Sequence, residues 1–377
     1  MSNLLKSYSS YMEACTDCGI CIEVCPFYKI TGNELYGGRA KLKAAYALYK
    51  GEELSEEEIK TLLLCTRCDQ CNQMCPAQIP ISEIVAAARG RLKELGKAPG
   101  KYLVIAKNIV EANSPMAAPP KDRLACLPEE FKPPEKAKYL YIPGCIASFR
   151  ARDAVKDAIK LFTKLGLDFT VLGEREPCCG LFLSDIGLVE EAAKLAEVNT
   201  KLFEETGAEY VITECPSCYD MFKRVYPKLY REPSYKVLHV VELLHLLLKE
   251  GKLRFKDGGK EEVIVYKDPC PLVRRHGITE QPREILKAIP GVKLVEYKEN
   301  RGDAVCCGAP AGVKPLFPDL AAKLAEYLVN EAVELKASYI AVACTFPLSH
   351  GWIAERKTSH TNQDDLSNSA RAPSVAT

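Results

Sequence analysis

The sequence predicts an α+β multidomain protein, in which a helical N-terminal domain is followed by two copies of an α/β unit. Three features of the 377-residue chain lead to this prediction. Two similar cysteine runs flank helix-forming segments near the N-terminus. A proline-rich stretch follows them, and in the second half strands alternate with helices in an order that occurs twice.

Each cysteine run near the N-terminus has the spacing C-x2-C-x2-C-x3-C-P, which is typical of bacterial [4Fe–4S] ferredoxins. Three thiolates at intervals of three residues can surround three corners of one cube, and the fourth cysteine, followed by proline, reaches the neighbouring cube. One predicted cubane cluster is held by Cys15, Cys18, Cys21 and Cys75, and the other by Cys65, Cys68, Cys71 and Cys25. The alternative, zinc, needs four ligands, usually in two separated pairs, which these runs fit poorly.

Composition restricts the class of protein. The chain has 51 basic and 50 acidic residues, so no overall field attracts nucleic acid. Its 18 cysteines are grouped as metal-ligand runs, which indicates a reducing compartment, because in an oxidising one they would pair. No secretory signal is recognised, and the longest apolar stretch, 237–248, is too short and polar to cross a bilayer. We expect a cytoplasmic protein that reaches the inner face of a membrane only through a partner.

The N-terminal domain, residues 1–96, is expected to be mostly helical rather than a pair of β-hairpins. Its predicted helices cover residues 38–49, 59–64 and 81–95. Gly51 ends the first of these helices. Ser55 and Glu58 form a capping box before the second, and Ser82 is the expected cap of the third.

Residues 97–137 are punctuated by prolines, and we interpret them as a linker that crosses a surface and joins two domains. One helix is predicted within this linker, over residues 102–112. Cys126 stands alone there, and a lone cysteine is more often a small buried hydrophobic residue than a ligand.

The second half of the chain contains the repeat. In the first copy, 138–235, strands are predicted over 139–142, 168–172 and 210–213, with helices over 153–165 and 188–206. In the second copy, 262–355, strands are predicted over 263–266, 292–297 and 339–343, with helices over 282–288 and 319–335. Residues 236–261 are expected to be a connecting helix, and the polar tail 356–377 is expected to be disordered.

In both copies the cysteines come just after predicted strands, at the sheet edge where open parallel sheets place their ligands. In the first copy 32 residues separate Cys145 from Cys178, and in the second copy 35 separate Cys270 from Cys306. Neighbouring strand ends lie about 5 Å apart, so thiolates from three loops can converge on one metal site. We expect Gly180 and Gly308 to let the backbone approach a bulky cluster closely.

This pattern, C…CCG…C-P-x-C, resembles the cysteine-rich CCG domain of heterodisulfide reductases and related Fe–S oxidoreductases. The segment from Asp268-Pro269-Cys270 to Cys306-Cys307-Gly308-Ala309 is very similar to that family. A two-cluster ferredoxin domain with two CCG domains resembles the D-type subunit of heterodisulfide reductases. It equally resembles the iron–sulfur subunits of glycolate, lactate and anaerobic glycerol-3-phosphate dehydrogenases. The resemblance covers residues 12 to about 347.

The resemblance implies an unusual non-cubane [4Fe–4S] cluster at which a disulfide is cleaved. The implied residues are Cys145, Cys178, Cys179, Cys215 and Cys218 at the first site, and Cys270, Cys306, Cys307 and Cys344 at the second. Cys218 follows Cys215 at a helix start, where the dipole favours thiolate. The second copy reads Cys344-Thr345-Phe346-Pro347, so the fifth thiolate is missing. The alternatives at this second site are an altered cluster, an incomplete cluster or another metal such as zinc. A frameshift near Phe346 would explain both the missing cysteine and the changed character of the residues that follow.

Two other groups of polar residues are candidate sites. His239, Glu242 and His245 are expected to form the wet face of an amphipathic helix rather than a metal site. Residues 274–276, with the sequence Arg-Arg-His, follow Cys270 and could hold an anionic substrate or a cluster sulfide. They could equally form a solvated loop, and the sequence leaves these alternatives open. Neither G-x-G-x-x-G after a strand nor a P-loop occurs, so nucleotide and flavin binding are not supported.

The sequence therefore predicts an oxidoreductase subunit that relies on redox partners, because it offers no site for the organic half of a reaction. In one interpretation single electrons pass through two cubane clusters to or from a CCG cluster, where a disulfide is reduced. In the other, the chain only relays electrons between a flavin-dependent 2-hydroxy-acid or glycerol-3-phosphate dehydrogenase and a quinone pool. The expected partners are a flavoprotein dehydrogenase, or a membrane cytochrome or quinone-reactive subunit. A zinc-stapled scaffold is the third interpretation, which the ferredoxin-type runs disfavour.

Overall fold

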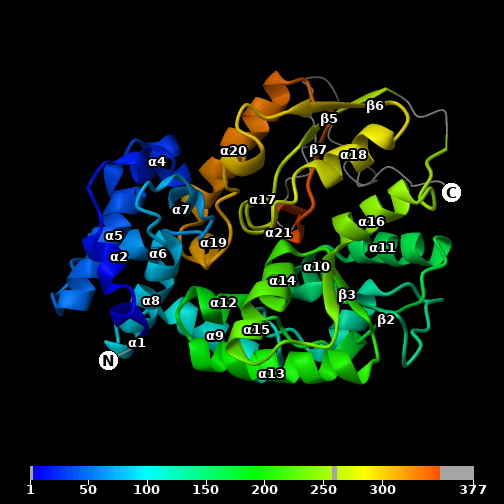
Figure 1. Ribbon diagram of the computed structural model, residues 1–377, viewed down its shortest axis with the longest axis horizontal. Helices are drawn as coiled ribbons and strands as arrows, with labels where there is room; N and C mark the ends of the chain where they lie inside the picture. The colour runs from blue at the N-terminus through cyan, green and yellow to red at the C-terminus, as the bar shows by residue number, and fades with distance from the viewer. Residues whose placement is uncertain (1–2, 257–260, 349–377) are drawn as a thin grey trace, which may run out of the picture.

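The computed structural model describes residues 3–256 and 261–348. It has three parts: a helical N-terminal part, a first α/β unit in the middle of the chain and a second α/β unit after it (Figure 1). Among the described residues, no helix is long and apolar enough to cross a membrane. The predicted tail, 356–377, and the last residues of the predicted second unit lie outside the described residues.

The N-terminal part is helical, as the sequence predicts. Its helices are α1 (Asn3–Lys6), α2 (Ser9–Glu13), α3 (Ile20–Glu23), α4 (Pro26–Thr31), α5 (Gly38–Lys50), α6 (Glu56–Leu63), α7 (Gln70–Met74) and α8 (Ile81–Glu94), with a 3-10 turn at Glu34–Tyr36. Gly51 ends α5 with φ 84°, and the Ser55–Glu58 capping box starts α6. The prediction for Ser82 is wrong, because Pro80 precedes α8 and the Ser82 hydroxyl lies inside the helix, where it donates to Asp69.

Residues 97–137 do more than cross a surface. They form α9 (Gly100–Ala112) and a 3-10 helix at Pro120–Cys126. Cys126 is 2% exposed and packs in a hydrophobic core with Tyr141 and Phe162 of the first α/β unit. This segment is therefore part of the first unit's core, and Cys126 is the small buried residue that we expected.

The first unit has a parallel sheet of four strands in the order β2-β1-β3-β4. The strands are β1 (Tyr139–Tyr141), β2 (Phe169–Val171), β3 (Tyr210–Thr213) and β4 (Lys236–His239). Its helices are α10 (Gly144–Arg150), α11 (Arg152–Lys164), α12 (Leu181–Asp185), α13 (Val189–Glu205), α14 (Pro216–Asp220), α15 (Tyr226–Leu229) and α16 (Val240–Lys249), with a 3-10 turn at Gly173–Arg175 and a π-helix at Met221–Val225. The expected connecting helix over 236–261 is wrong at its start, because β4 pairs with β3 and the helix begins only at Val240.

The second unit has a parallel sheet of three strands in the order β6-β5-β7. The strands are β5 (Glu262–Tyr266), β6 (Val292–Glu296) and β7 (Tyr339–Ala341). Its helices are α17 (Cys270–His276), α18 (Glu280–Ala288), α19 (Val313–Leu316), α20 (Pro318–Glu334) and α21 (Thr345–Leu348), with a 3-10 turn at Arg301–Asp303. In both units the first strand lies between the second and the third, so the repeat seen in the sequence is a repeat of topology.

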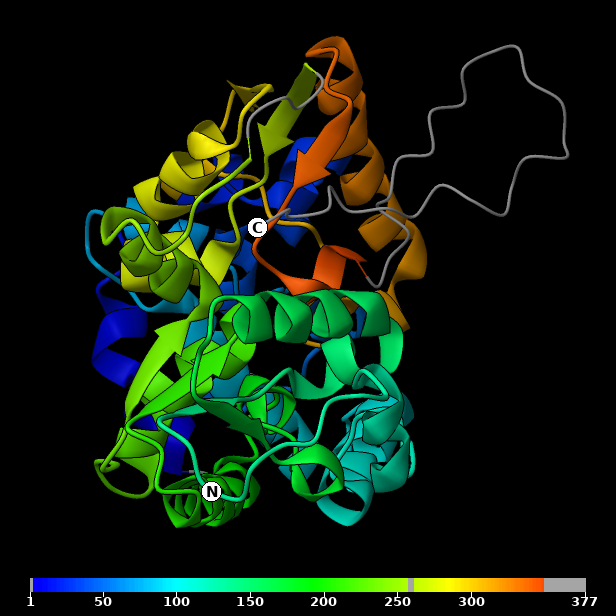
Figure 2. The ribbon, with the colours of Figure 1, turned by 90° about the vertical axis from the view of Figure 1, so that its right-hand side faces the viewer.

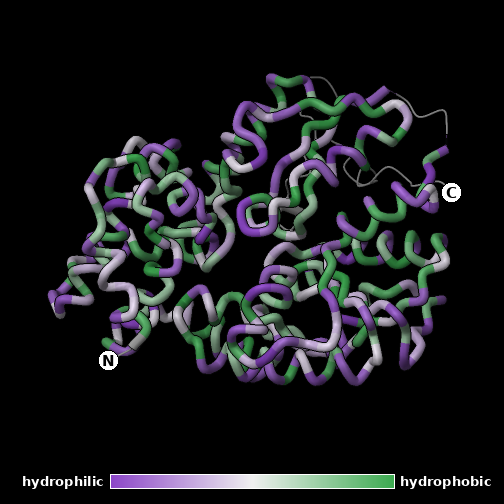
Figure 3. Tube along the Cα trace, in the orientation of Figure 1, coloured by the Kyte–Doolittle hydropathy of each residue, from purple (hydrophilic) through white to green (hydrophobic). Residues whose placement is uncertain are grey.

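Burial of one face fixes the helices against the sheets. In α11 the side chains of Val155, Ile159 and Phe162 are buried, and the positions between them are mostly charged. Along the helices of Figure 3, short hydrophobic and hydrophilic stretches alternate in the way that such amphipathic packing requires. Figure 2 shows α11 crossing in front of the region where the two α/β units meet.

Buried ion pairs join the three parts. Arg275 of α17 binds Asp69 of the N-terminal part and, at 2.6 Å, Asp220 of the first unit. His276 lies 3.0 Å from the same Asp220 carboxylate, and Arg67 pairs with Asp185 at 2.7 Å. The Arg-Arg-His segment is thus neither a solvated loop nor an open anion site, because Arg275 and His276 hold the parts together.

Candidate iron–sulfur sites

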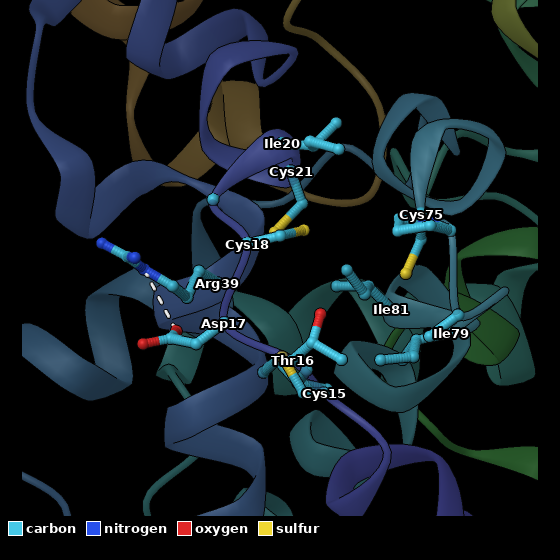
Figure 4. A pocket seen from close by; sticks show the side chains of 14 residues that line it. Cys15, Thr16, Asp17, Cys18, Ile20, Cys21, Arg39, Cys75, Ile79 and Ile81 are labelled. Atoms are coloured by element: carbon cyan, nitrogen blue, oxygen red, sulfur yellow. Dashed lines mark ion pairs between the residues drawn. The ribbon is translucent and has the colours of Figure 1, made fainter.

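The first site, which we call the outer site, is a pocket of about 380 Å³ in the N-terminal part. Figure 4 shows four cysteine side chains around one common space, and they are Cys15, Cys18, Cys21 and Cys75. The remaining lining is largely apolar, with Leu42, Ile79 and Ile81. Burial, followed by the neighbouring Cys15 and Cys18, raises the pKa of the Cys21 thiol to about 11. Iron would relieve this unfavourable crowding of thiolates, because it supplies positive charge between them.

Backbone conformation lets these cysteines converge. Asp17 and Gly19 have positive φ angles of 57° and 80°, so the chain turns tightly between successive cysteines. Gly38 packs against the same loop, and a Cβ atom there would lie 2.8 Å from Cβ of Cys21. A side chain at position 38 would therefore push Cys21 out of place.

The second site, the inner site, is a pocket of about 360 Å³. Its cysteines are Cys25, Cys65, Cys68 and Cys71. Each run thus lends its fourth cysteine to the other pocket, which is the grouping that the spacing predicts. A soft donor set of four thiols in a compact, largely apolar pocket fits a [4Fe–4S] cluster. The ligand assignment itself stays a prediction.

The five cysteines of the first α/β unit come from loops that follow three neighbouring strands. They are all buried: Cys145, Cys178, Cys179, Cys215 and Cys218. The thiols of Cys145 and Cys178, of Cys178 and Cys179, and of Cys179 and Cys218 lie close enough to shift each other's pKa. The same holds for the thiols of Cys218 and Cys215. The thiols therefore form one continuous group, whose size and softness suit a multi-iron cluster.

The glycine that makes room for this group is not the one expected. A Cβ atom on Gly180 or Gly308 would meet Leu195 of α13 or Leu324 of α20, at 3.1 and 2.9 Å. These two glycines therefore allow helices to pack closely, and the expectation that they accommodate a cluster is wrong. Gly144 faces the sulfurs instead, because a Cβ atom there would lie 3.0 Å from Sγ of Cys218.

The helix start after β3 favours the thiolate of Cys215 rather than that of Cys218. The Cys218 thiol lowers the pKa of Cys215 to about 7, against burial, and the backbone N–H groups of Cys218 and Ser217 add to the effect. Hydrogen bonds with Cys179 and Cys215, together with burial, raise the pKa of Cys218. Cys218 lies in the first turn of α14 as expected, but the expectation that its thiolate is favoured is wrong, because the neighbouring thiols and burial outweigh the helix dipole.

Two charged residues that the sequence analysis missed support the first group. Arg123 donates to Sγ of Cys145 at 3.2 Å and to the Glu176 carboxylate at 2.8 Å. Glu176 also accepts from the N–H of Gly144 at 3.0 Å. Arg123 and Glu176 are 2% and 3% exposed, and because they are 53 positions apart no local pattern pairs them.

The cysteines of the second unit open into a larger pocket, of about 640 Å³, which lies where the three parts meet. Its thiols are Cys270, Cys306, Cys307, Cys344 and also Cys68 of the inner site. The Cys306 thiol donates to Oγ1 of Thr66 at 3.3 Å, so the inner site and the second unit are directly joined. Lys267 lines the pocket, is 3% exposed and donates to the carbonyl of Asp268 at 2.5 Å.

The residues after Cys344 start α21 rather than supply a thiol. Thr345 is 2% exposed and reaches across to Cys215 of the first unit, where its hydroxyl helps to lower the pKa of that thiol. Among the described residues, no group of three His, Cys, Asp or Glu side chains is arranged to hold a single metal ion.

The remaining candidates are structural. His239 caps α16 through Nδ1, which accepts from Val241 at 3.2 Å, and Glu242 completes the capping box. His245 binds Glu284 at 2.9 Å. The three side chains do not form a metal site. The prediction that they lie on the solvent-exposed face of a helix is wrong for His239, which is 1% exposed.

Comparison with known proteins agrees with this arrangement. The CCG family, described as "Cysteine-rich domain", matches residues 139–223 and 264–348. The family described as "4Fe-4S dicluster domain" matches residues 11–79. The chain is 33% identical over 367 residues to the D-type subunit of the dihydromethanophenazine:CoB--CoM heterodisulfide reductase of Methanosarcina acetivorans, covering 91% of this chain and 89% of that protein.

More distant relatives are longer proteins. A probable iron–sulfur-binding oxidoreductase FadF of Bacillus subtilis is 29% identical, covering 86% of this chain and 48% of its own length. An EtfAB:quinone oxidoreductase of Syntrophomonas wolfei is 29% identical, covering 80% of this chain and 48% of its own length. The chain is thus an oxidoreductase subunit with 4Fe–4S cofactors, and it belongs to the CCG-domain iron–sulfur oxidoreductase family that includes the D-type subunits of heterodisulfide reductases.

Proposed function

We propose that this protein reduces a disulfide at a CCG cluster, with electrons that enter through the N-terminal domain. The observation that carries the proposal is the pocket of about 640 Å³ at the junction of the three parts. Its lining includes Cys306 and Cys307 of the second CCG domain, Cys68 of the inner site, and Pro216 and Ser217 of the first CCG domain. A bound molecule would therefore touch both CCG domains beside the electron-carrying domain.

Pocket size and charge suit a small anionic disulfide. The junction pocket is larger than the outer and inner sites, which have volumes of about 380 and 360 Å³. A ligand placed there would lie beside the thiols of Cys306 and Cys307. Lys267 makes no ion pair with a carboxylate among the described residues, so its ammonium can attract an anionic group.

The proposed reaction is a two-electron reduction. When bound, the iron–sulfur clusters supply electrons one at a time. The S–S bond of the substrate breaks, two electrons and two protons are taken up, and two thiols leave. Lys267 would stabilise the thiolate that forms first, because a charge-assisted hydrogen bond in a buried pocket is strong.

The second candidate is an electron relay between a flavoprotein and a quinone-reactive partner. It is favoured by the name of one relative, an EtfAB:quinone oxidoreductase, whose similarity covers 80% of this chain. In that case the junction pocket would serve as a contact between domains and not as a substrate site. A cytoplasmic location and attachment to the membrane through the partner stay predictions for both candidates.

The test is an anaerobic assay with the full chain and reduced methyl viologen. The probes are cystine and the CoB–CoM heterodisulfide that names the heterodisulfide reductase relatives. The proposal expects two viologen radicals to be oxidised for each disulfide consumed. Intact iron–sulfur signals without any disulfide-dependent oxidation would overturn it in favour of the relay.

A further inference from the structure

Three cationic side chains bind at three of the four cysteines of the inner site. Lys41 Nζ lies 3.8 Å from Sγ of Cys25. Arg89 donates to the carbonyl of Cys65 at 2.7 Å, and Arg274 donates to the carbonyl of Cys68 at 2.8 Å. Lys41 and Arg89 are each 2% exposed. The inner site thus has a cation next to Cys25, another next to Cys65 and a third next to Cys68.

None of these cations forms an ion pair with a carboxylate among the described residues, because their other hydrogen bonds go to backbone carbonyls. Lys41 donates to the carbonyls of Tyr36 and Gly37. With Cys25 this makes three acceptors, which match the three N–H bonds of an ammonium and exceed the two of a neutral amine. The buried Nζ of Lys41 therefore has three acceptors and no carboxylate among its hydrogen-bond partners.

Arg89 and Arg274 follow the same pattern. The acceptors of Arg89 are the carbonyls of Leu62, Leu63, Cys65, Asp185 and Ala311. Those of Arg274 are the carbonyls of Cys68, Gly302 and Ala304. Asp69 also lines the inner site, but Arg275 pairs with its carboxylate. The inner site therefore lies in an excess of positive charge.

The outer site differs in this respect. Arg39 lines it, but its side chain is 28% exposed and pairs with Glu34 at 2.9 Å and with Asp17 at 3.6 Å. Lys43 pairs with the same Asp17 and is 65% exposed. Exposed and paired charges are largely screened, whereas buried unpaired charges are not.

We propose that Lys41, Arg89 and Arg274 raise the reduction potential of the cluster at the inner site above that at the outer site. This inference rests on the proposed ligand assignment. One-electron reduction adds a single negative charge and neither makes nor breaks a bond, so nearby cations stabilise the reduced form. Charge, hydrogen bonds to sulfur and solvent exposure are the factors by which a protein sets such potentials. The inner site is then reduced first when electrons are limiting.

The test is a reductive titration of the anaerobic full chain with dithionite, followed by electron paramagnetic resonance. Cys18→Ser, which alters an outer-site cysteine, identifies the outer signal. In Lys41→Gln we expect about tenfold less reduced inner site at a fixed potential, which corresponds to about 59 mV for a one-electron couple. The outer signal should keep its midpoint. Lys43→Gln is the matched control, two positions along the same helix, and should shift neither midpoint.

A second pair of variants keeps the inference testable if Lys41→Gln does not fold. Arg274→Gln should lower the midpoint of the same inner signal, and Arg274→Lys, which keeps the charge, should restore most of it. Unchanged midpoints in Lys41→Gln or Arg274→Gln, or equal shifts of both signals, would overturn the inference. Absence of both cubane signals from the wild-type protein would instead overturn the cofactor assignment. A failed disulfide assay would leave the titration intact.

Discussion

The thiol of Cys306 in the second CCG domain lies 3.3 Å from the hydroxyl oxygen of Thr66 in the N-terminal domain. Thr66 directly follows Cys65, which lines the inner site, so one hydrogen bond separates a residue of that site from the second CCG site. If Cys306 is a thiolate ligand, the hydroxyl donates to its sulfur. Hydrogen bonds to cluster sulfurs raise the reduction potential.

The first prediction concerns this contact. Thr66→Val removes the hydroxyl with little change in shape, and we expect a lower midpoint potential for the second CCG site with unchanged iron content. Electron paramagnetic resonance during a reductive titration measures it. Thr16→Val, at an exposed threonine that lines the outer site, is the control. A second-site midpoint equal to that of the wild type would show that Thr66 does not bind a ligand sulfur.

The second prediction concerns cofactor content. Two cubane clusters and one or two CCG clusters correspond to about 12 to 16 irons per chain. Cys179→Ser should lose the signal of the first CCG site and keep both cubane signals, because Cys179 lies in a different domain from them. Iron and sulfide analysis with electron paramagnetic resonance measures both. Loss of every signal together would contradict the separation of the sites, and stoichiometric zinc would support the zinc alternative.

The third prediction concerns the buried pair of Arg123 and Glu176. Arg123→Gln leaves the Glu176 carboxylate buried without its cation, which typically costs about 3–5 kcal/mol. We expect a clearly lower midpoint of anaerobic thermal unfolding. Adding Glu176→Gln should recover part of the loss, since the uncompensated charge disappears. Arg91→Gln is the control, because it breaks the ion pair with Glu94, in which the two side chains are 25% and 36% exposed. It should change the free energy of unfolding by no more than about 1 kcal/mol.

The fourth prediction concerns pH. Burial lowers the pKa of His239 to about 3, with the nearby His276 adding to the effect and a backbone hydrogen bond at Glu214 opposing it. The unfolded chain binds a proton at His239 below about pH 6.5 while the folded chain does not, so stability falls as the pH drops from 6.5 towards 3. His239→Asn keeps an N-cap acceptor and should reduce this slope by up to about 1.4 kcal/mol per pH unit.

Urea unfolding between pH 7 and pH 5 measures this slope. His245→Asn is the comparison variant, because His245 lies on the same helix and binds Glu284. Equal slopes in the wild type and in His239→Asn would mean that His239 is protonated in the folded state, contrary to the expected pKa.

The fifth prediction concerns close packing of the N-terminal domain on the first CCG domain. A Cβ atom on Gly187 would lie 2.6 Å from the carbonyl oxygen of Ala86 and 2.8 Å from Cα of Gly90, both in α8. Gly187→Ala should therefore force the two domains apart, at a cost of about 1–3 kcal/mol. Gly166→Ala is the control, because Gly166 also has a positive φ but no atom within 4 Å of the added Cβ. Anaerobic thermal unfolding compares them.

The sequence predicts well what depends on local pattern. Cysteine spacing predicts the grouping of thiols in the outer and inner sites, and hydrophobic periodicity predicts the strand–helix order of both α/β units. The Ser55–Glu58 capping box forms as predicted, because both partners lie within one turn. These features involve residues that are close in the chain or that repeat at fixed intervals.

The features that the sequence analysis missed depend on partners far apart in the chain. Arg274 binds the carbonyl of Cys68, 206 positions away, and no local pattern signals such a contact. The sequence does not reveal β4, because Lys236–His239 directly precede the apolar residues of α16, and the two segments together resemble a single helix. Ser82 looks like a cap locally, but its hydroxyl donates to Asp69, 13 positions earlier, instead.

Arg275, which binds both Asp69 and Asp220, has a consequence for how damage would spread through the molecule. Arg275 lines the junction pocket, and its partner Asp69 lines the inner site. Loss of the Arg275 side chain would therefore leave two buried carboxylates, in two different parts of the chain, each without one cation. A fault at this single position would disturb the inner site and the junction pocket together.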